Sequence, residues 1–286
     1  MSDGTLERSY GKVFNQVADA YDRYRPTYPD ALLDHICEVA ALGAGDRVLE
    51  IGCGTGQLTR DLLARGLRVF AIEPGDRLIA LARQNLEDIG DVEFVHARLE
   101  DAPLPRERFR AVFSAAAMHW IDPDLGWREA AEALAPGGTL ALVQYFGLSE
   151  PRSTDDQQAL LSAIAKIAPE LAANWPTYRE LDATLAGVRE RRANISEVWA
   201  WLGSYDVRRD YAAHLFDDAQ IAAVPSLVEH TAAELGALIG TMSFWSKLTS
   251  QQREDIEREN RILYERLGRP IRSSILACAV TARRAA

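Results

Sequence analysis

Apolar runs and helical patterns alternate through the first half of the chain. Mostly apolar runs lie at 48–51, 69–74, 109–112 and 139–146, and leucines and alanines at helical spacing lie between them. Continuous apolar runs of this length indicate strands that are covered on both faces, as in a parallel sheet. The alternation therefore predicts a doubly wound α/β sheet with helices on both faces.

One turn in this pattern carries most of the functional information. Residues 47–56 read Arg-Val-Leu-Glu-Ile-Gly-Cys-Gly-Thr-Gly, and leucines at helical spacing follow them. A strand, a glycine-rich turn and a helix form the nucleotide-binding corner of a doubly wound sheet. Glycine tolerates the positive φ angles of such a turn and leaves room for a ligand beside the backbone.

The spacing of the glycines excludes two common nucleotide motifs. The dinucleotide fingerprint needs a third glycine at position 57, where this chain has Gln57, and the Gly-Lys-Ser/Thr of a phosphate-binding loop occurs nowhere in the sequence. Glu50 at the end of the strand would repel a phosphate group but would suit an ammonium group. The motif thus points to a cofactor with a cationic amino-acid end.

The turn resembles the first motif of the class I S-adenosylmethionine-dependent methyltransferases. The resemblance covers 14–147, and the stretch from His119 through Trp120 is similar to a small-molecule subgroup that includes trans-aconitate methyltransferase. It implies a Rossmann-like fold with a seven-stranded, mostly parallel sheet, whose last strand lies antiparallel beside the fifth. It further implies methyl transfer with S-adenosyl-L-methionine as cofactor and S-adenosyl-L-homocysteine as product. The matching residues of the first motif are Glu50, Gly52, Gly54 and Gly56.

The resemblance also assigns cofactor contacts. Glu73 ends the second strand at the family's ribose-binding position, where a carboxylate can accept both ribose hydroxyls. Leu78 matches the apolar residue that lies against adenine, and Tyr21 matches the tyrosine that closes over the cofactor. The full set of expected contacts is Tyr21, Arg25, Glu50, Gly52, Gly54, Gly56, Gln57, Glu73, Pro74, Leu78, Leu99, Glu100, Ala115, Ala116, His119 and Trp120.

Two residues depart from the family pattern. Arg98 and Arg110 stand where the family commonly has acids. An acid near position 98 would accept a hydrogen bond from the adenine amino group, which arginine cannot do. We expect Leu99 and Glu100 beside it to supply that contact instead.

The strand rhythm stops after residue 147. We expect 1–147 to form N-terminal helices and the cofactor-binding core, 148–220 a helical cap over the substrate pocket, and 221–286 the helices and strands that complete the sheet. Helices are predicted at 15–24, 30–41, 155–167, 178–192, 195–202, 232–247 and 250–267, with an apolar strand at 273–281.

The cap region is rich in aromatic side chains. Small-molecule sites are mostly apolar with a few placed polar groups, so an aromatic cap favours a bulky apolar or aromatic acceptor. Packing of the cap onto the core explains the same aromatics, and this alternative stays open for each of them. The candidates for the substrate pocket are Trp175, Trp199, Trp201, Tyr205, His214 and Trp245.

His119 is the candidate general base because it follows the fourth strand and histidine titrates near neutral pH. A role in the cofactor pocket is the alternative. Methyl transfer mainly requires that the nucleophile, the methyl group and the leaving sulfur are aligned, so a base matters only for an acceptor that must lose a proton. With no convincing base, an acceptor carbon, phenol or carboxylate is favoured over an alcohol.

Composition narrows the remaining classes. The 286 residues suffice for a large core, and the three cysteines are too few and too scattered for a disulfide framework or a zinc site. No signal peptide or long apolar run occurs, so a cytoplasmic protein without a membrane segment is expected. A net charge of −10 disfavours binding to nucleic acid.

The sequence therefore predicts a methyltransferase that acts on oxygen, carbon or nitrogen of a small metabolite, in settings such as natural-product biosynthesis. Two alternatives stay open: a tRNA or other nucleic-acid methyltransferase, and a cofactor-holding protein that acts as a cyclase or an assembly partner without methyl transfer. No metal ligand set is evident. Whether the chain forms a homo-oligomer is open.

Overall fold

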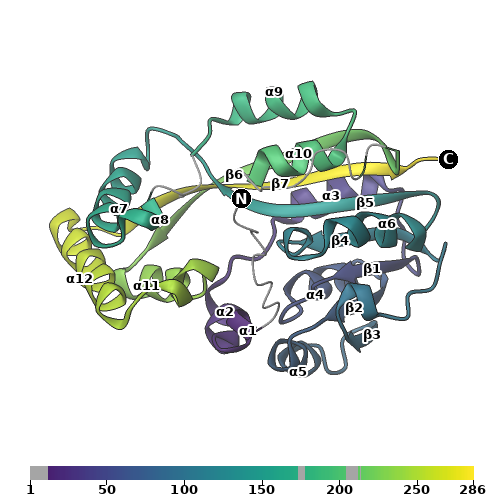
Figure 1. The fold of residues 1–286 in the computed structure, drawn as a ribbon, viewed down its shortest axis with the longest axis horizontal. Coiled ribbons are helices and arrows are strands. Elements are labelled where there is room, and N and C mark those ends of the chain that lie inside the picture. The colour runs from purple at the N-terminus through teal and green to yellow at the C-terminus, as the bar shows by residue number, and fades with distance from the viewer. Residues whose placement is uncertain (1–11, 173–177, 204–211, 213) are drawn as a thin grey trace, which may run out of the picture.

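A seven-stranded sheet runs through the molecule (Figure 1), seen in a computed structural model that describes residues 12–172, 178–203, 212 and 214–286. The strand order is β3-β2-β1-β4-β5-β7-β6. The strands are β1 (Arg47–Ile51), β2 (Arg68–Glu73), β3 (Asp91–His96), β4 (Phe109–Ala115), β5 (Leu134–Gly147), β6 (Phe216–His230) and β7 (Ile271–Arg284).

The pairing of the strands confirms the predicted topology. β1 to β5 pair in parallel, and β7 lies antiparallel between β5 and β6. The chain leaves β1 toward β2 on one side, and β4 returns on the other side of β1. This reversal opens a crevice at the carboxyl ends of β1 and β4, which is where ligands bind in open α/β sheets.

Alternating side chains of the strands build two cores, one on each face of the sheet. Val48 and Phe113 meet helices α3, α4 and α5 on one face, whereas Leu49 and Val112 meet α6 and α10 on the other. Strands buried on both faces explain the unbroken apolar runs in the sequence. The first six helices are α1 (Lys12–Asn15), α2 (Ala18–Tyr24), α3 (Asp30–Val39), α4 (Gln57–Ala64), α5 (Asp76–Asn85) and α6 (Pro123–Ala133), with short 3₁₀ turns η1 (Leu99–Asp101) and η2 (Met118–Trp120).

The predicted helix starts follow from their capping residues. The Asp122 side chain accepts a hydrogen bond from the Asp124 backbone at 3.0 Å and precedes a proline at the first position of α6. Thr249 and Gln252 form a reciprocal capping box at the start of α12. Each cap satisfies a backbone N–H of the first turn that has no partner within its helix.

The later helices do not form a single cap over 148–220. α9 and α10 pack on β6 and β7, whereas α7, α11 and α12 form a cluster at the end of β6 and the start of β7 (Figure 1). The expected boundary at 220 also falls inside β6, an edge strand whose exposed acids and Pro225 hide it from pattern analysis. The helices are α7 (Thr154–Ile167), α8 (Pro169–Ala172), α9 (Leu181–Arg191), α10 (Ile195–Gly203), α11 (Ala232–Gly240) and α12 (Ser250–Leu267), with η3 (Ser243–Lys247) between the last two.

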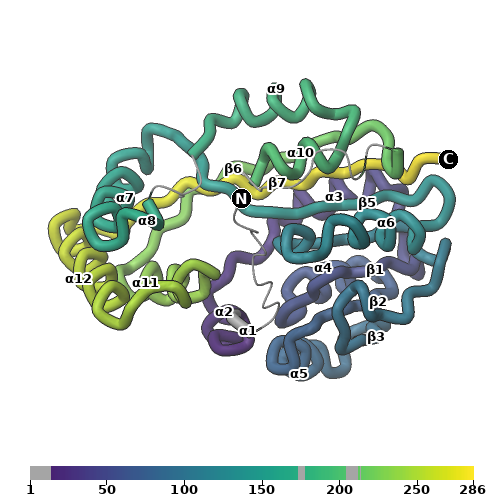
Figure 2. Tube along the Cα trace, viewed as in Figure 1, coloured from purple at the N-terminus to yellow at the C-terminus, as the bar shows by residue number. Residues whose placement is uncertain are grey.

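The N-terminal helices bridge the two parts of the molecule. Figure 2 shows α1 and α2 between α5, beside the crevice, and α11 of the helical cluster, and both neighbours contact them. Within the described ranges, no helix combines the length and apolar character needed to cross a membrane.

Candidate functional site

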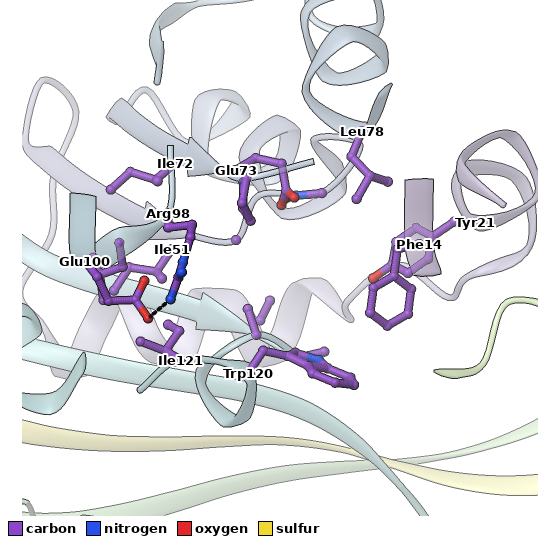
Figure 3. A pocket seen from close by; sticks show the side chains of 17 residues that line it. Phe14, Tyr21, Ile51, Ile72, Glu73, Leu78, Arg98, Glu100, Trp120 and Ile121 are labelled. Carbon is purple, nitrogen blue, oxygen red and sulfur yellow. Dashed lines mark hydrogen bonds and ion pairs between the residues drawn. The ribbon is translucent and has the colours of Figure 1, made fainter. Parts of the chain in front are cut away.

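A cavity occupies the crevice at the carboxyl ends of β1, β2 and β4 (Figure 3). Its floor comes from the strand ends and the glycine turn, and one wall comes from α1 and α2. Most of the lining is apolar, with one buried acid at its centre. The lining residues are Phe14, Tyr21, Ile51, Gly52, Gly54, Ile72, Glu73, Pro74, Leu78, Arg98, Leu99, Glu100, Ala115, Ala116, Ala117, Trp120 and Ile121.

The glycine turn needs glycine for two separate reasons. Gly52 and Gly54 have φ angles of +74° and +57°, a region that side chains with a Cβ rarely adopt. A Cβ on Gly52 would also lie 2.4 Å from the Cβ of Ala117, which follows β4. The turn can therefore approach β4 this closely only without a side chain, and this close approach shapes the cavity floor.

Glu73 is held rigidly at the centre of the cavity. Its carboxylate accepts hydrogen bonds from the backbone of Gly54 at 2.9 Å and of Gly75 at 2.8 Å, and the residue is 5% exposed. Burial raises the pKa of Glu73, and these two backbone donors act against the rise. Each carboxylate oxygen keeps a lone pair for another donor. The side chain can therefore accept from a pair of neighbouring hydroxyls, as the sequence predicts for a ribose.

Aromatic side chains form the wall opposite the strand ends. Phe14 meets Tyr21 edge-on at 5.8 Å between ring centroids and Trp120 at 5.6 Å. Such edge-to-face pairs fix ring positions more firmly than apolar contact alone. The N-terminal helices and η2 thereby share one aromatic wall, with the three rings directed toward the cavity (Figure 3).

An ion pair lies at another part of the cavity wall. Arg98 and Glu100 are 3.1 Å apart, and Glu100 also accepts from the backbone of Asp122 at 3.2 Å. Burial acts to raise the pKa of Glu100, but these hydrogen bonds hold it below its usual value. Arg110 lies elsewhere, where it donates to the Ala41 carbonyl at 2.9 Å. Of the two departures from the family pattern, only Arg98 touches the cavity.

Glu50 does not face the cavity, which corrects the expectation that its carboxylate meets the ligand directly. It is 1% exposed and accepts a hydrogen bond from the Thr59 hydroxyl at 2.7 Å, at the start of α4. Burial raises the pKa of Glu50 to about 7. The side chain thus ties the strand to the helix beneath the turn.

This burial predicts a pH effect on stability. The folded state keeps a proton on Glu50 up to about pH 7, whereas an ordinary glutamate loses it near pH 4.5, so rising pH favours the unfolded state over this interval. Urea unfolding at pH 5 and pH 8 should show a smaller loss of stability in Glu50→Gln than in the wild type. The exposed Glu87→Gln serves as control and should behave as the wild type. Equal losses in all three proteins would contradict the prediction.

Arg25 and Gln57 also point away from the cavity. Arg25 donates to the side-chain and carbonyl oxygens of Thr241, both at 2.9 Å, and its guanidinium lies 5.1 Å from the Tyr21 ring. Gln57 donates to the Asp22 and Arg25 carbonyls at 3.2 and 3.3 Å. Both side chains hold α2 beside the cavity. Their polar atoms, which were expected to contact the cofactor, are instead hydrogen-bonded within the fold.

Two further predicted cofactor contacts do not line the cavity. Gly56 begins α4 with a φ of +87°, and a Cβ there would lie 2.8 Å from Leu86, so its role is close packing against α5. His119 lies behind Trp120, with 5.0 Å between ring centroids, and burial lowers its pKa to about 4. His119 is therefore neutral at physiological pH.

The expected substrate-pocket residues do not meet at this cavity. Trp199 of α10 is 1% exposed and belongs to the core. The ring centroid of Trp201 lies 4.0 Å from the Arg179 guanidinium carbon, and the ring packs closely against Gly187 of α9. Trp245 packs among α11 and α12, and His214 is exposed. Trp175 and Tyr205 fall outside the described residues. The described aromatic side chains of the expected cap therefore pack within the fold and do not line the cavity. For Trp199 and Trp201 the reason is that α10 lies on the sheet and not over the crevice.

Six lining residues were not among the expected contacts, and of these Arg98 had been named only as a departure from the family pattern. Ile51 ends β1 and Ile72 stands one residue before the end of β2, and this position at the carboxyl edge was a usable signal. Ala117 was detectable only through its contact with Gly52. Phe14 and Ile121 lie on segments already matched to the family, but nothing in their spacing marked them as cavity residues.

Comparisons with known proteins agree with this geometry. Residues 49–142 match the family model described as a methyltransferase domain. An uncharacterized methyltransferase of Mycobacterium tuberculosis is 38% identical over 136 residues, which cover 48% of this chain and 53% of that protein. Demethylmenaquinone methyltransferase of Clavibacter sepedonicus is 28% identical over 195 residues, covering 65% of this chain and 79% of that protein. This chain thus spans about half the length of the mycobacterial relative.

Among solved structures, an S-adenosylmethionine-dependent methyltransferase of Thiobacillus denitrificans, bound to S-adenosyl-L-homocysteine, has the same fold. The TM-score is 0.52 at 17% identity, over 95% of this chain and 97% of that one. The fold and the crevice define a class I methyltransferase domain. Residues 49–142 match a methyltransferase domain, and the fold is shared with a structure solved with S-adenosyl-L-homocysteine. The finer resemblance to the trans-aconitate subgroup stays a prediction.

Proposed function

We propose that this protein transfers a methyl group from S-adenosyl-L-methionine to oxygen, carbon or nitrogen of a small apolar or aromatic metabolite. The observation that carries the proposal is the cavity of Figure 3, where a buried acid at the end of β2 accepts a hydrogen bond from the glycine turn. Apart from the Arg98–Glu100 ion pair, the rest of the lining is mostly apolar and aromatic. The acid suits the ribose hydroxyls, and the enclosure suits an apolar acceptor.

The residues of the cavity fit this cofactor. Glu73 would hold the ribose, and Leu78 and Leu99 would flank the adenine. The open backbone of Gly52 and Gly54 would admit the amino-acid end without steric conflict. Bound there, the cofactor supplies a methyl group already activated on a sulfonium.

The protein's own contribution is to orient the acceptor and to exclude water. Phe14, Tyr21 and Trp120 form a firm wall from which an apolar acceptor can be aligned with the methyl group. Such orientation is worth roughly 7–11 kcal/mol in favourable cases. A neutral His119 with a pKa of about 4 is a weak base. An acceptor carbon, or a phenol or carboxylate that ionises unaided, therefore suits the site better than an alcohol.

The Clavibacter relative is named for the acceptor demethylmenaquinone, which supports a small-molecule acceptor for this chain as well. The acceptor of this chain is a separate question, because the two proteins are only 28% identical. A setting in natural-product biosynthesis and a cytoplasmic location belong to the same proposal.

An acceptor screen with labelled methyl donor tests the proposal. We expect label on small phenols, carboxylates or electron-rich aromatic carbons, and His119→Gln should keep most of this activity. Label confined to aliphatic alcohols, with activity lost in His119→Gln, would overturn the preference for acceptors that need no base. Label on bulk tRNA or DNA would replace the small-molecule assignment. Tight S-adenosylhomocysteine binding without transfer to any acceptor would favour a non-methylating role.

A further inference from the structure

Arg25 follows α2 and turns the chain out of the helix. It precedes Pro26, and the residue before a proline is disfavoured in helical backbone and driven to an extended conformation. The φ and ψ angles of Arg25 are accordingly −71° and +136°. This turn places the Arg25 side chain beside the end of α11, a helix that contributes no residue to the lining of the cavity.

The guanidinium of Arg25 is held by a single residue at the end of α11. It donates from Nε to the Thr241 hydroxyl and from Nη2 to the Thr241 carbonyl, both at 2.9 Å. Thr241 is 1% exposed, and its hydroxyl donates in turn to the Leu238 carbonyl at 2.7 Å. The carboxyl end of a helix carries a partial negative charge, which favours a cation there. Two donors of one planar group, bound to two acceptors of one residue, fix the plane of the guanidinium.

The same guanidinium lies over the ring of Tyr21, one helical turn earlier in the chain. The guanidinium carbon is 5.1 Å from the ring centroid, which is within the range of cation–π attraction. Arg25 therefore contacts two partners at once. It joins the buried end of α11 to an aromatic side chain that lines the cavity.

Tyr21 depends on its neighbours to keep its place in the cavity wall (Figure 3). Its Cε1 atom lies 3.8 Å from the position that a Cβ on Gly54 would take, so the ring covers the glycine turn. Within the described residues, the side chains in contact with the ring face or edge are Arg25 and Phe14. The Tyr21 hydroxyl has no hydrogen bond to another described residue. Burial raises the pKa of Tyr21, so this hydroxyl keeps its proton and can donate to a ligand beside the turn.

We propose that Arg25 is a positioning residue for the cofactor: anchored on Thr241, it holds the Tyr21 ring over the glycine turn. The end of α11 thereby influences the affinity for a ligand that it does not touch. This inference rests on the proposed function, since it takes S-adenosyl-L-methionine as the ligand of the cavity.

Calorimetric titration of S-adenosylhomocysteine into the full chain measures the contribution of Arg25. Arg25→Gln should weaken binding about tenfold, because it removes the cation from the ring and the paired donors from Thr241. Arg25→Lys keeps the charge without the planar fork, so its affinity should lie between the two. Arg23→Gln is the matched control. Arg23 lies over the Tyr24 ring at 5.4 Å on the same helix, neither residue lines the cavity, and binding should equal that of the wild type.

A double-mutant cycle separates positioning of Tyr21 from a general stabilising role. If Arg25 acts through the Tyr21 ring, Arg25→Gln should cause little further loss of affinity once Tyr21→Leu has removed that ring. A residue that merely holds α2 in place would cost the same factor in both backgrounds. Equal factors would therefore overturn the proposal.

Thr241 tests the connection from the side of α11. Thr241→Val removes the hydroxyl that accepts from Arg25 and should weaken S-adenosylhomocysteine binding about threefold, the scale of one neutral hydrogen bond. Thr241→Ser keeps the hydroxyl and should restore most of the affinity. Where Arg25→Gln does not fold, as judged by thermal unfolding, this comparison decides the question.

The failure of this proposal differs from the failure of the proposed function. Wild-type affinity in Arg25→Gln, or equal affinity in Thr241→Val and Thr241→Ser with no loss in either, would overturn the role of Arg25 alone. The cofactor assignment would stand, since the wild type still binds S-adenosylhomocysteine in that case. No binding to the wild type would overturn the methyltransferase proposal, and the role of Arg25 with it.

Discussion

Replacing Glu73 with alanine is expected to weaken S-adenosylhomocysteine binding by about tenfold or more. The carboxylate is the one acid buried at the centre of the cavity, and it also organises the turn by accepting from Gly54 and Gly75. Alanine removes the acceptor for the ribose hydroxyls and leaves two backbone donors without their partner. Calorimetric titration measures the affinity, and thermal unfolding of the free protein reports any loosening of the turn.

Two variants separate these effects. Glu73→Gln keeps the shape and one acceptor oxygen but loses the charge, so its affinity should fall between those of the wild type and the alanine variant. Glu93→Ala removes an acid from the neighbouring strand β3, where the side chain is 61% exposed and pairs with Arg47. It should bind S-adenosylhomocysteine as the wild type does. Wild-type affinity in Glu73→Ala would remove the ribose role from this residue.

Replacing Trp199 with alanine should lower the free energy of unfolding by about 3–5 kcal/mol. The side chain is among the largest that are fully buried, and it packs with Val188 and Phe216 between α9, α10 and β6. Its loss leaves a void that the surrounding core fills only in part. Urea unfolding gives the stability, and the affinity of the remaining folded protein for S-adenosylhomocysteine should be unchanged.

Trp201→Ala is the matched control for this variant. Trp201 lies on the same helix but is only half-buried, between the guanidinium groups of Arg179 and Arg191. Its removal should cost less stability than the removal of Trp199. If Trp199→Ala instead kept its stability and lost acceptor turnover, the residue would belong to the substrate pocket after all.

Elements with a local physical cause could be predicted to within a few residues. The strand from Arg47 to Ile51 carries the apolar side chains of Val48, Leu49 and Ile51. α6 begins where the Asp122 side chain accepts from a backbone N–H of the first turn and a proline, which has no N–H to satisfy, takes the first position. The edge strand β6 could not be predicted in the same way, since exposed acids and Pro225 interrupt the alternation of apolar and polar residues along it. Its identity as a strand comes from thirteen paired positions with β7.

The residues of the candidate site likewise fall into two groups, those that the local sequence predicts and those that depend on distant partners. The glycine turn and Glu73 were predictable because a tight turn and an acid at a strand end each restrict the residue type locally. The contact of Arg25 with Thr241 could not be predicted, because the two residues lie 216 positions apart and nothing in the sequence around Arg25 indicates its partner. The same holds for Trp199, whose aromatic ring fits a pocket or a core equally well by composition.

By itself, the sequence determined the parallel part of the sheet, the glycine turn and the acid that faces the cavity, since each follows from the backbone preferences and polarity of neighbouring residues. Only the tertiary structure decided which polar atoms were left for a ligand. Arg25 is engaged by Thr241 and Glu50 by Thr59. Hydrogen-bond partners far apart in the chain meet only after packing, and each partner satisfied within the fold is withdrawn from binding.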